Sequence, residues 1–178
     1  MTEELAGGGT GLLNGLDGAE LRARLQSCCR ADAWVERVMA GRPYGSEAEL
    51  LATSDRATAE LDADGLAQAL SGHPRIGETA ASAHGSDGRS AAWSRGEQSG
   101  VAGAGSDLLG ELAAANVAYE ERFGHVYLVC ASGRSAPELL AVCQGRLGND
   151  PETERGVVLE ELAKINRLRL LKLLGGER

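Results

Sequence analysis

The chain has 178 residues, a formal net charge of -8 and only 3% aromatic residues. This length fits one domain with a core of its own. The acidic balance disfavours nucleic acid and anionic membranes as partners, because either would need a strong basic patch that the sequence lacks. Abundant Ala, Leu and Gly with few β-branched residues favour helices over sheet.

The cysteines and the N-terminus bear on the compartment. The four cysteines show no spacing typical of metal ligands; they are Cys28, Cys29, Cys130 and Cys143. Free thiols are typical of reducing compartments, so we predict a cytoplasmic protein. The N-terminus lacks a basic segment followed by an apolar run, and no apolar run approaches the roughly 20 residues that span a bilayer. We therefore expect no membrane partner.

Residues 1–15 are rich in glycine and poor in periodic apolar residues, so we predict a mobile tail followed by one helical domain over residues 16–174. From Asp17, apolar residues recur at helical spacing, and a short helix around Trp34 follows. Ser46 and Asp62 are placed to cap the next two helices, of which the second stops at Gly72. The first 70 residues thus read as helices joined by short turns.

The second half continues in the same way. We predict helices over residues 91–100 and 106–123, a third that begins at Ser135 with Glu138 as its capping-box partner, and a last one opened by Asp150 and Pro151. Residues 125–131 form the only continuous apolar, β-branched run of strand length, and they could be extended without belonging to a sheet. The fold expected is all-α: a single compact bundle of about seven to eight helices with one short extended segment.

Few residues are suited to chemistry. The three histidines, His73, His84 and His125, have no spacing typical of a zinc site. No glycine run matches a dinucleotide fingerprint or a phosphate-binding loop. The sequence therefore predicts neither a metal nor a cofactor, and acid–base chemistry is what remains.

His73 and Glu97 are the residues that fit such chemistry. Pro74 cannot extend the helix that ends at Gly72 and restricts the backbone of His73, so the imidazole stands on a stiff corner. A histidine and a carboxylate on facing elements suit proton transfer. Taken alone, each residue has an ordinary structural reading as well: a helix-terminating histidine and a solvated helical glutamate.

Seven short motifs, read together over about residues 17–172, give the sequence a stronger meaning. In order and spacing they resemble the 2-oxo-4-hydroxy-4-carboxy-5-ureidoimidazoline (OHCU) decarboxylase family. The motifs are Trp34 to Tyr44, His73-Pro-Arg-Ile-Gly77, Trp93-Ser-Arg-Gly-Glu-Gln98, Tyr119 to Gly124, Val129 to Ala131, Arg146-Leu-Gly-Asn149 and Glu160 to Ile165.

The resemblance implies an all-helical carboxy-lyase of urate (purine) catabolism, commonly a homodimer, that needs no cofactor. It would act after urate oxidase and hydroxyisourate hydrolase, to which it could be functionally coupled, and convert the anionic OHCU into S-allantoin. Carried onto this chain, the catalytic pair falls on His73 and Glu97. The implied substrate-binding residues are Pro74, Ser94, Arg95, Gly96, Gln98, Val129, Cys130 and Ala131.

These residue types suit the implied reaction. His73 would deliver a proton to one face of a ring carbon, while Glu97 would hold the substrate hydroxyl and take up its proton. Three arginines, Arg75, Arg134 and Arg146, could bind a carboxylate or serve only to cap helices. The chain departs from the family pattern at His125-Val126-Tyr127, where an aromatic-proline-aromatic run is common, so the geometry of that wall is open.

Two other functions stay open on the residues alone. The first is a cofactor-free hydrolase of a related purine-derived ring, which would use His73 and Glu97 on water and would release no carbon dioxide. The second is a helical interaction module without chemistry, for which amphipathic helices and acidic charge would suffice. Dispersal of the polar groups over a flat surface would favour the module, and their convergence in one pocket would favour an enzyme.

Overall fold

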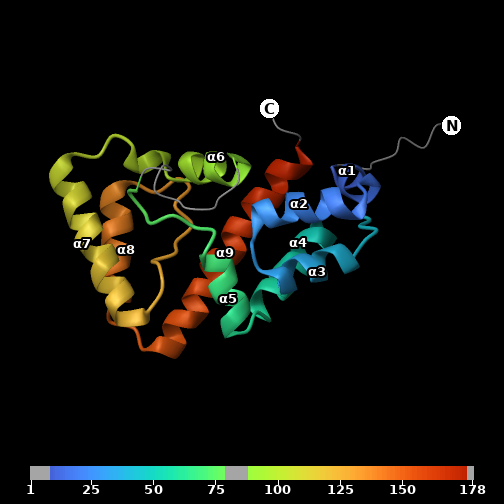
Figure 1. Cartoon of the computed structure of the whole chain (residues 1–178). Coiled ribbons are helices and arrows are strands. Elements are labelled where there is room, and N and C mark those ends of the chain that lie inside the picture. The colour runs from blue at the N-terminus through green and yellow to red at the C-terminus, as the bar shows by residue number, and fades with distance from the viewer. Residues whose placement is uncertain (1–8, 79–87, 176–178) are drawn as a thin grey trace.

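The computed structural model describes residues 9–78 and 88–175, and within them the chain forms nine α-helices, one short 3-10 helix and no strand. The expected all-α fold is confirmed (Figure 1). The helices are α1 (Thr10–Gly15), α2 (Gly18–Cys28), α3 (Asp32–Ala40), α4 (Glu47–Ala59), α5 (Ala63–Leu70), α6 (Gly88–Glu97), η2 (Ser99–Val101), α7 (Ser106–Phe123), α8 (Ala136–Arg146) and α9 (Pro151–Leu174).

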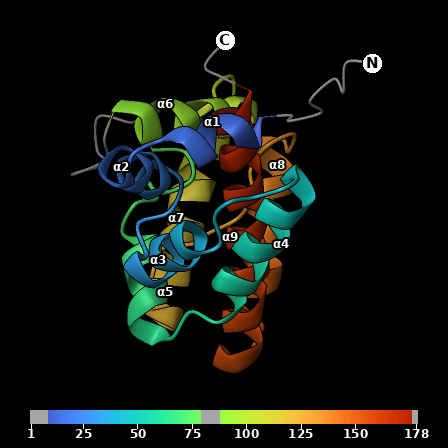
Figure 2. The same ribbon diagram turned by 90° about the vertical axis from the view of Figure 1, so that its right-hand side faces the viewer.

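The long helix α9 runs through the molecule and separates two groups of helices (Figures 1 and 2). Helices α2 to α5 lie on one side, where α4 packs along α9 and α3 packs on α4. Helices α7 and α8 pack against each other on the other side, and α6 lies across one end of the bundle. Helix α9 therefore borders both halves of the fold.

The buried apolar residues form two clusters that meet at the segment after α7. One cluster is built on α2 to α5 and α9, and the other on η2, α7 and α8. Leu128 belongs to the first cluster, whereas its neighbours Tyr127 and Val129 belong to the second. The predicted extended segment is extended and pairs with no strand among the described residues. It lies on the seam between the two cores.

Local capping signals position several helix ends as predicted. Ser135 and Glu138 form a complete capping box at the start of α8. Asp62 accepts a hydrogen bond from the Gly65 amide at 2.8 Å, and Asp150 caps α9 ahead of Pro151. Such caps satisfy amide groups that a helix leaves unpaired at its N-terminus. These ends are therefore set by neighbouring residues rather than by the tertiary fold.

The predicted mobile tail over residues 1–15 is wrong in its second half. Residues 10–15 form α1, which packs on α9, and Leu13 is only 2% exposed. The side chain of Asn14 exchanges two hydrogen bonds of 2.9 Å with the backbone of Tyr44. Contacts with distant residues hold this helix although its own sequence is a weak helix former. Residues 1–8 lie outside the described part of the chain.

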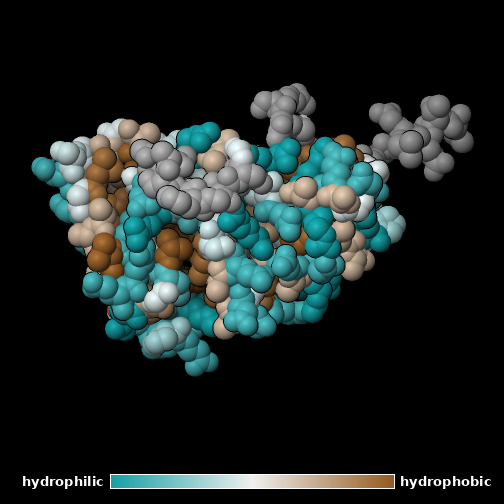
Figure 3. All heavy atoms as spheres, viewed as in Figure 1, coloured by the Kyte–Doolittle hydropathy of each residue, from teal (hydrophilic) through white to brown (hydrophobic). Residues whose placement is uncertain are grey.

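On the face shown in Figure 3, hydrophilic residues cover most of the half formed by α2 to α5, while hydrophobic residues reach the surface mainly in the half that contains α7. Val117 on α7 is 50% exposed. Among the residues that the structure describes, no helix is both long enough and apolar enough to cross a membrane.

Candidate active site

The corner that bears His73 is fixed by side chains from two other helices. The amide of Gly77 donates to Oε1 of Gln98 at 3.0 Å, which ties the corner to the end of α6. Asn116 of α7 donates to the carbonyl of Ile76 at 2.8 Å. Gly77 has a φ of 89°, a conformation that glycine adopts without strain. The stiff corner expected from Pro74 is thus also braced from outside.

His73 and Glu97 line the same small cavity on the seam between the two cores. The cavity and the open space at its mouth together measure about 300 Å³, and the walls come from the corner, α6, the extended segment and α9. Its lining residues are His73, Pro74, Ile76, Ser94, Glu97, Gln98, Tyr127, Leu128, Val129, Ala131 and Ile165. The polar groups therefore converge in a pocket and are not dispersed over a flat surface.

Glu97 is held in a buried ion pair with Arg169 of α9. The Nε and Nη2 atoms of Arg169 donate to the two carboxylate oxygens of Glu97 at 2.9 and 3.0 Å. Arg169 also donates to Oγ of Ser94 at 3.1 Å and to the Cys28 carbonyl at 3.2 Å. Nζ of Lys172 lies 3.7 Å from the same carboxylate. Two cations thus face Glu97, and its orientation is fixed by a bidentate contact.

The surroundings of His73 favour the neutral imidazole. Burial lowers the pKa of His73 well below its ordinary value, and the positive charges of Arg169 and Arg30 lower it further. The resting protein therefore presents an uncharged ring at neutral pH. Such a ring has one nitrogen that donates a hydrogen bond and one that accepts a proton.

The structure brings five of the eight expected substrate-binding residues to this cavity: Pro74, Ser94, Gln98, Val129 and Ala131. Arg95 lines an adjoining hollow of about 830 Å³, which shares Pro74, Ser94 and Gln98 with the cavity. Gly96 is exposed on α6, and Cys130 turns its amide to Glu161; neither lines either hollow. The binding roles of all eight remain predictions.

The sequence analysis missed Arg169 as a site residue. It lies one helical turn after Ile165 on the face of α9 that packs into the core, and it is only 2% exposed. A charged residue in an apolar stripe requires a buried partner. That signal could have singled out Arg169, although the sequence could not say that the partner is Glu97.

The three arginines with open roles lie outside the lining of the cavity. Arg75 is exposed and pairs with Glu120 and Glu78. Arg146 is buried against Glu154, and the backbone amide of Arg134 closes a turn to the Ala131 carbonyl at 3.0 Å. None of the three lines the cavity. Arg75 and Arg146 are thus bound to glutamates of the fold.

Of the other two histidines, only His125 is described, and it does not line the cavity. His125 contacts the carbonyl of Val126 at 3.0 Å and stacks on Phe123, away from the cavity lining. His84 lies outside the described residues. Within residues 9–78 and 88–175, no group of three or more His, Cys, Asp or Glu residues is arranged to hold a metal ion. His73 is the histidine that the described cavity contains.

A neutral imidazole and a buried carboxylate in one pocket of a helical domain are typical of an enzyme that works by acid–base catalysis. The sequence model of the OHCU decarboxylase family matches residues 14–171. The chain therefore belongs to that family, as its motifs predicted.

Two relatives and one of two similar solved structures support this assignment. The chain is 34% identical over 145 residues to the 2-oxo-4-hydroxy-4-carboxy-5-ureidoimidazoline decarboxylase of Amia calva, with 77% of each chain covered. It is 32% identical over 147 residues to the uric acid degradation bifunctional protein TTL of Arabidopsis thaliana, where 82% of this chain aligns. The chain spans only 45% of the length of that plant protein.

A crystal structure of OHCU decarboxylase in the presence of (S)-allantoin matches with a TM-score of 0.72 and 28% identity, over 85% of this chain and 96% of that one. A crystal structure of (S)-allantoin synthase matches with a TM-score of 0.68 and 20% identity, over 92% of this chain and 53% of that one. The second likeness shows the fold alone.

Proposed function

We propose that this chain decarboxylates OHCU to (S)-allantoin by acid–base catalysis in the His73–Glu97 cavity. The observation that supports this most is the convergence of the two predicted catalytic side chains in one pocket of a chain that belongs to the OHCU decarboxylase family. The 28% identical crystal structure that was determined in the presence of (S)-allantoin supports the same assignment.

The reaction itself explains why two side chains suffice. When the bond to the carboxylate breaks, its electron pair moves into the ring and the adjacent imine nitrogen takes up a proton. The resulting enol then loses its hydroxyl proton while the neighbouring ring carbon gains one, so this second step consumes no net proton. No external electron sink is needed, because the imine of the substrate accepts the electrons. The enzyme must orient the substrate and assist three proton movements: onto the imine nitrogen, off the hydroxyl and onto the ring carbon.

His73 acts in this scheme from its neutral form. Because its pKa is lowered, little of the imidazole is protonated at neutral pH. His73 must therefore first take up a proton, from the bound substrate or from solvent, before it can transfer that proton to the ring carbon. The cations that lower this pKa are Arg169 and Arg30, and their positive charge would also attract the substrate carboxylate. When that anion binds, its negative charge offsets Arg169 and Arg30 and favours a protonated His73. Substrate binding thus loads the proton donor.

Glu97 and the polar wall groups orient the substrate. The carboxylate of Glu97 is anchored by Arg169, and it holds the hydroxyl whose proton leaves as the ring carbonyl forms. Ser94, Gln98 and Val129 line the cavity, and their side chains and peptide groups would hydrogen-bond the ring and ureido groups. Together they present one face of the ring carbon to His73, which accounts for a single enantiomer of product.

The proposal extends to the pathway, the assembly and the compartment. Urate oxidase and hydroxyisourate hydrolase would supply the unstable substrate, in keeping with the uric acid degradation named for the plant relative. The active form would be a homodimer, as the family resemblance implies. The four cysteines are free thiols, which supports a reducing cytoplasm as its compartment.

The test uses substrate made in place. Urate oxidase and hydroxyisourate hydrolase convert urate to OHCU, and carbon dioxide release and allantoin enantiomers are followed with and without this protein. We expect faster carbon dioxide release and nearly pure (S)-allantoin when the protein is present. Ring opening without carbon dioxide would identify the alternative hydrolase, and rates equal to the spontaneous reaction would refute enzymatic action on OHCU.

A further inference from the structure

The extended wall of the cavity, residues 127–131, has no sheet to satisfy its peptide groups. Buried peptide groups need partners, because an unpaired one costs about as much as a lost hydrogen bond. Two charged side chains supply them here. Nη1 of Arg146 donates to the Leu128 carbonyl at 2.7 Å, and Oε2 of Glu161 accepts from the Cys130 amide at 2.8 Å. The wall is thus held from α8 and α9.

These two contacts fix the peptide groups of the residue between them. The two peptide bonds that flank Val129 are trans and planar, so in each one the C=O and the N–H point in opposite directions. The Leu128 carbonyl turns to Arg146, and the Val129 N–H therefore points the other way. The Cys130 N–H turns to Glu161, and the Val129 carbonyl likewise points away from it. Val129 lines the cavity.

Val129 consequently offers a hydrogen-bond donor and an acceptor side by side. Among the described residues, neither its N–H nor its carbonyl takes part in a hydrogen bond. A neighbouring donor and acceptor complement an amide or urea edge, in which a carbonyl stands next to an N–H. The proposed substrate has such edges in its ring and in its ureido group.

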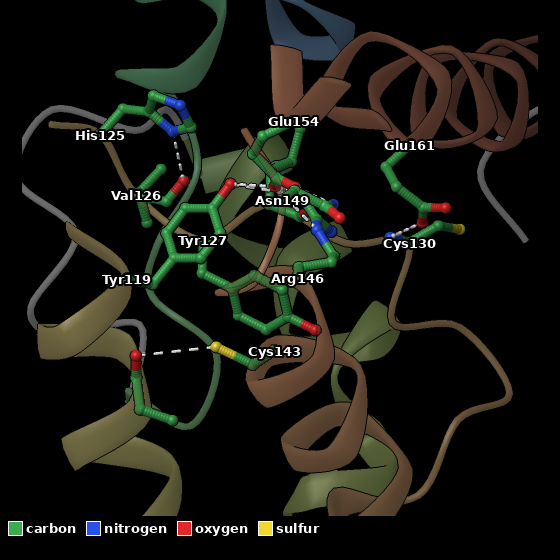
Figure 4. Close-up of polar contacts among 12 residues, drawn as sticks. Tyr119, His125, Val126, Tyr127, Cys130, Cys143, Arg146, Asn149, Glu154 and Glu161 are labelled. Carbon is green, nitrogen blue, oxygen red and sulfur yellow. Dashed lines mark hydrogen bonds and ion pairs between the residues drawn. The ribbon is translucent and has the colours of Figure 1, made fainter. Parts of the chain in front are cut away.

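Arg146 is itself held rigidly. Its Nε atom donates to Oε1 of Glu154 at 2.8 Å, and Asn149 donates to the other oxygen of that carboxylate at 2.9 Å. The guanidinium lies 5.1 Å from the ring centre of Tyr127 and 5.6 Å from that of Tyr119. Figure 4 shows Tyr119, Asn149 and Arg146 gathered around Glu154. The group that binds Leu128 therefore has little freedom to move.

The wall depends on two carboxylates, because Glu154 holds Arg146 and Glu161 accepts the hydrogen bond from the Cys130 amide. Burial raises the pKa of Glu154, but hydrogen bonds from Arg146, Tyr119 and Asn149 outweigh it and hold the pKa below its usual range. For Glu161 the hydrogen bonds from Lys164 and the Cys130 amide likewise outweigh burial and lower its pKa. Both carboxylates stay ionised at neutral pH, so the two anchors of the wall do not change with pH in the working range.

We infer that Arg146 and Glu161 are positioning residues, which aim the Val129 N–H and carbonyl at the amide edge of the substrate. The inference rests on the proposed function. It also explains how the wall keeps its shape although His125-Val126-Tyr127 departs from the usual aromatic-proline-aromatic run. Tyr127 is still anchored, because its hydroxyl donates to the Leu139 carbonyl at 3.0 Å.

Two pairs of variants test the inference against a merely structural role. Arg146→Lys keeps the charge opposite Glu154, but one nitrogen replaces the three that bind Glu154 and the Leu128 carbonyl, so the contact with Leu128 is weakened. Tyr119→Phe is its control, since it disturbs the same buried cluster and leaves the bond to Leu128 in place. Glu161→Leu removes the acceptor for the Cys130 amide, while Glu161→Gln keeps one.

For Arg146→Lys and Glu161→Leu we expect KM for OHCU to rise about 10-fold, with a smaller fall in kcat, and the enantiomeric purity of allantoin to drop at saturating enzyme. Tyr119→Phe should lower the melting temperature and leave KM and purity unchanged, and Glu161→Gln should behave like the wild type. If Arg146→Lys does not fold, the Glu161 pair decides.

The inference is overturned if the folded variants keep the wild-type KM and product purity. It is also overturned if Tyr119→Phe changes KM as much as Arg146→Lys does, because the cluster would then act only through stability. Wild-type protein that releases no carbon dioxide from OHCU would refute the proposed function first, and the inference would fall with it.

Discussion

Arg169 binds both carboxylate oxygens of Glu97 with two nitrogens of one guanidinium, and both side chains are buried. A bidentate pair of this kind fixes the plane of the carboxylate as well as its charge. It also makes the pair sensitive to loss of one partner, because a buried charge left without a counter-charge is costly. Glu97 thus has a structural task beside its proposed catalytic one.

Glu97→Gln should therefore reduce both turnover and stability. The amide cannot take up the substrate proton, so we expect turnover to fall by a factor on the order of 10² or more. It also leaves Arg169 without a counter-charge, and we expect the free energy of unfolding to drop by about 3 kcal/mol. Denaturant unfolding and assays below the melting temperature measure the two effects separately.

The double variant Glu97→Gln with Arg169→Met is the control for that experiment. Removal of the unpaired guanidinium should restore much of the stability without restoring turnover. If Glu97→Gln alone kept wild-type turnover, the carboxylate would have only its structural role.

The sequence predicted those features that depend on neighbouring residues or on a family motif. Helix starts at Ser135 and Asp150 depend on residues within three positions, so they could be predicted and are confirmed. The family resemblance placed His73 and Glu97 together although they are far apart in sequence. The lining of the cavity by Pro74, Ser94, Gln98, Val129 and Ala131 was predicted on the same basis.

What the sequence did not reveal depends on contacts across the fold. The pairing of Arg169 with Glu97 could not be predicted, because the two residues are 72 positions apart in the sequence. The buried position of Leu13 depends on packing against α9 at the other end of the chain. The lowered pKa of His73 reflects burial and two arginines from other elements. In each case the partner cannot be inferred from the neighbouring sequence.

Leu13→Ala tests the packing of α1. Leu13 is 2% exposed and belongs to the first core cluster, so loss of its side chain should lower the free energy of unfolding by about 2 to 3 kcal/mol. The neighbouring Leu12 is 45% exposed, and Leu12→Ala should change stability by less than about 0.5 kcal/mol. Denaturant unfolding of both variants measures the difference. Equal effects would mean that α1 does not pack as described.

His73 should make the protein less stable as the pH falls below about 6.5, the ordinary pKa of histidine. Its pKa is lowered in the folded chain, so the unfolded chain binds a proton that the folded chain does not. The free energy of unfolding must then fall with pH, by at most about 1.4 kcal/mol per pH unit from this group.

His73→Asn removes this contribution. Unfolding curves at intervals from pH 8 to pH 5.5 should show that the wild type loses stability relative to the variant below pH 6.5. Carboxylates stay ionised over most of this window, so they affect both proteins equally. A constant difference between the two curves would contradict the lowered pKa.

His73→Asn should also abolish most catalysis, and the stereochemistry of the product tests its role most directly. If His73 transfers an exchangeable proton to one face of the ring carbon, wild-type enzyme in heavy water should give allantoin deuterated at that carbon in one enantiomer. The variant should give slow and largely racemic product, because only the spontaneous reaction remains. Its fold should be intact at pH 8, since the corner is braced by Gln98 and Asn116 rather than by the imidazole. Mass spectrometry and chiral chromatography measure label and enantiomer together, with Glu97→Gln as a second inactive reference. Enantiopure product formed at an undiminished rate by His73→Asn would remove this residue from the mechanism and direct attention to His84 or His125.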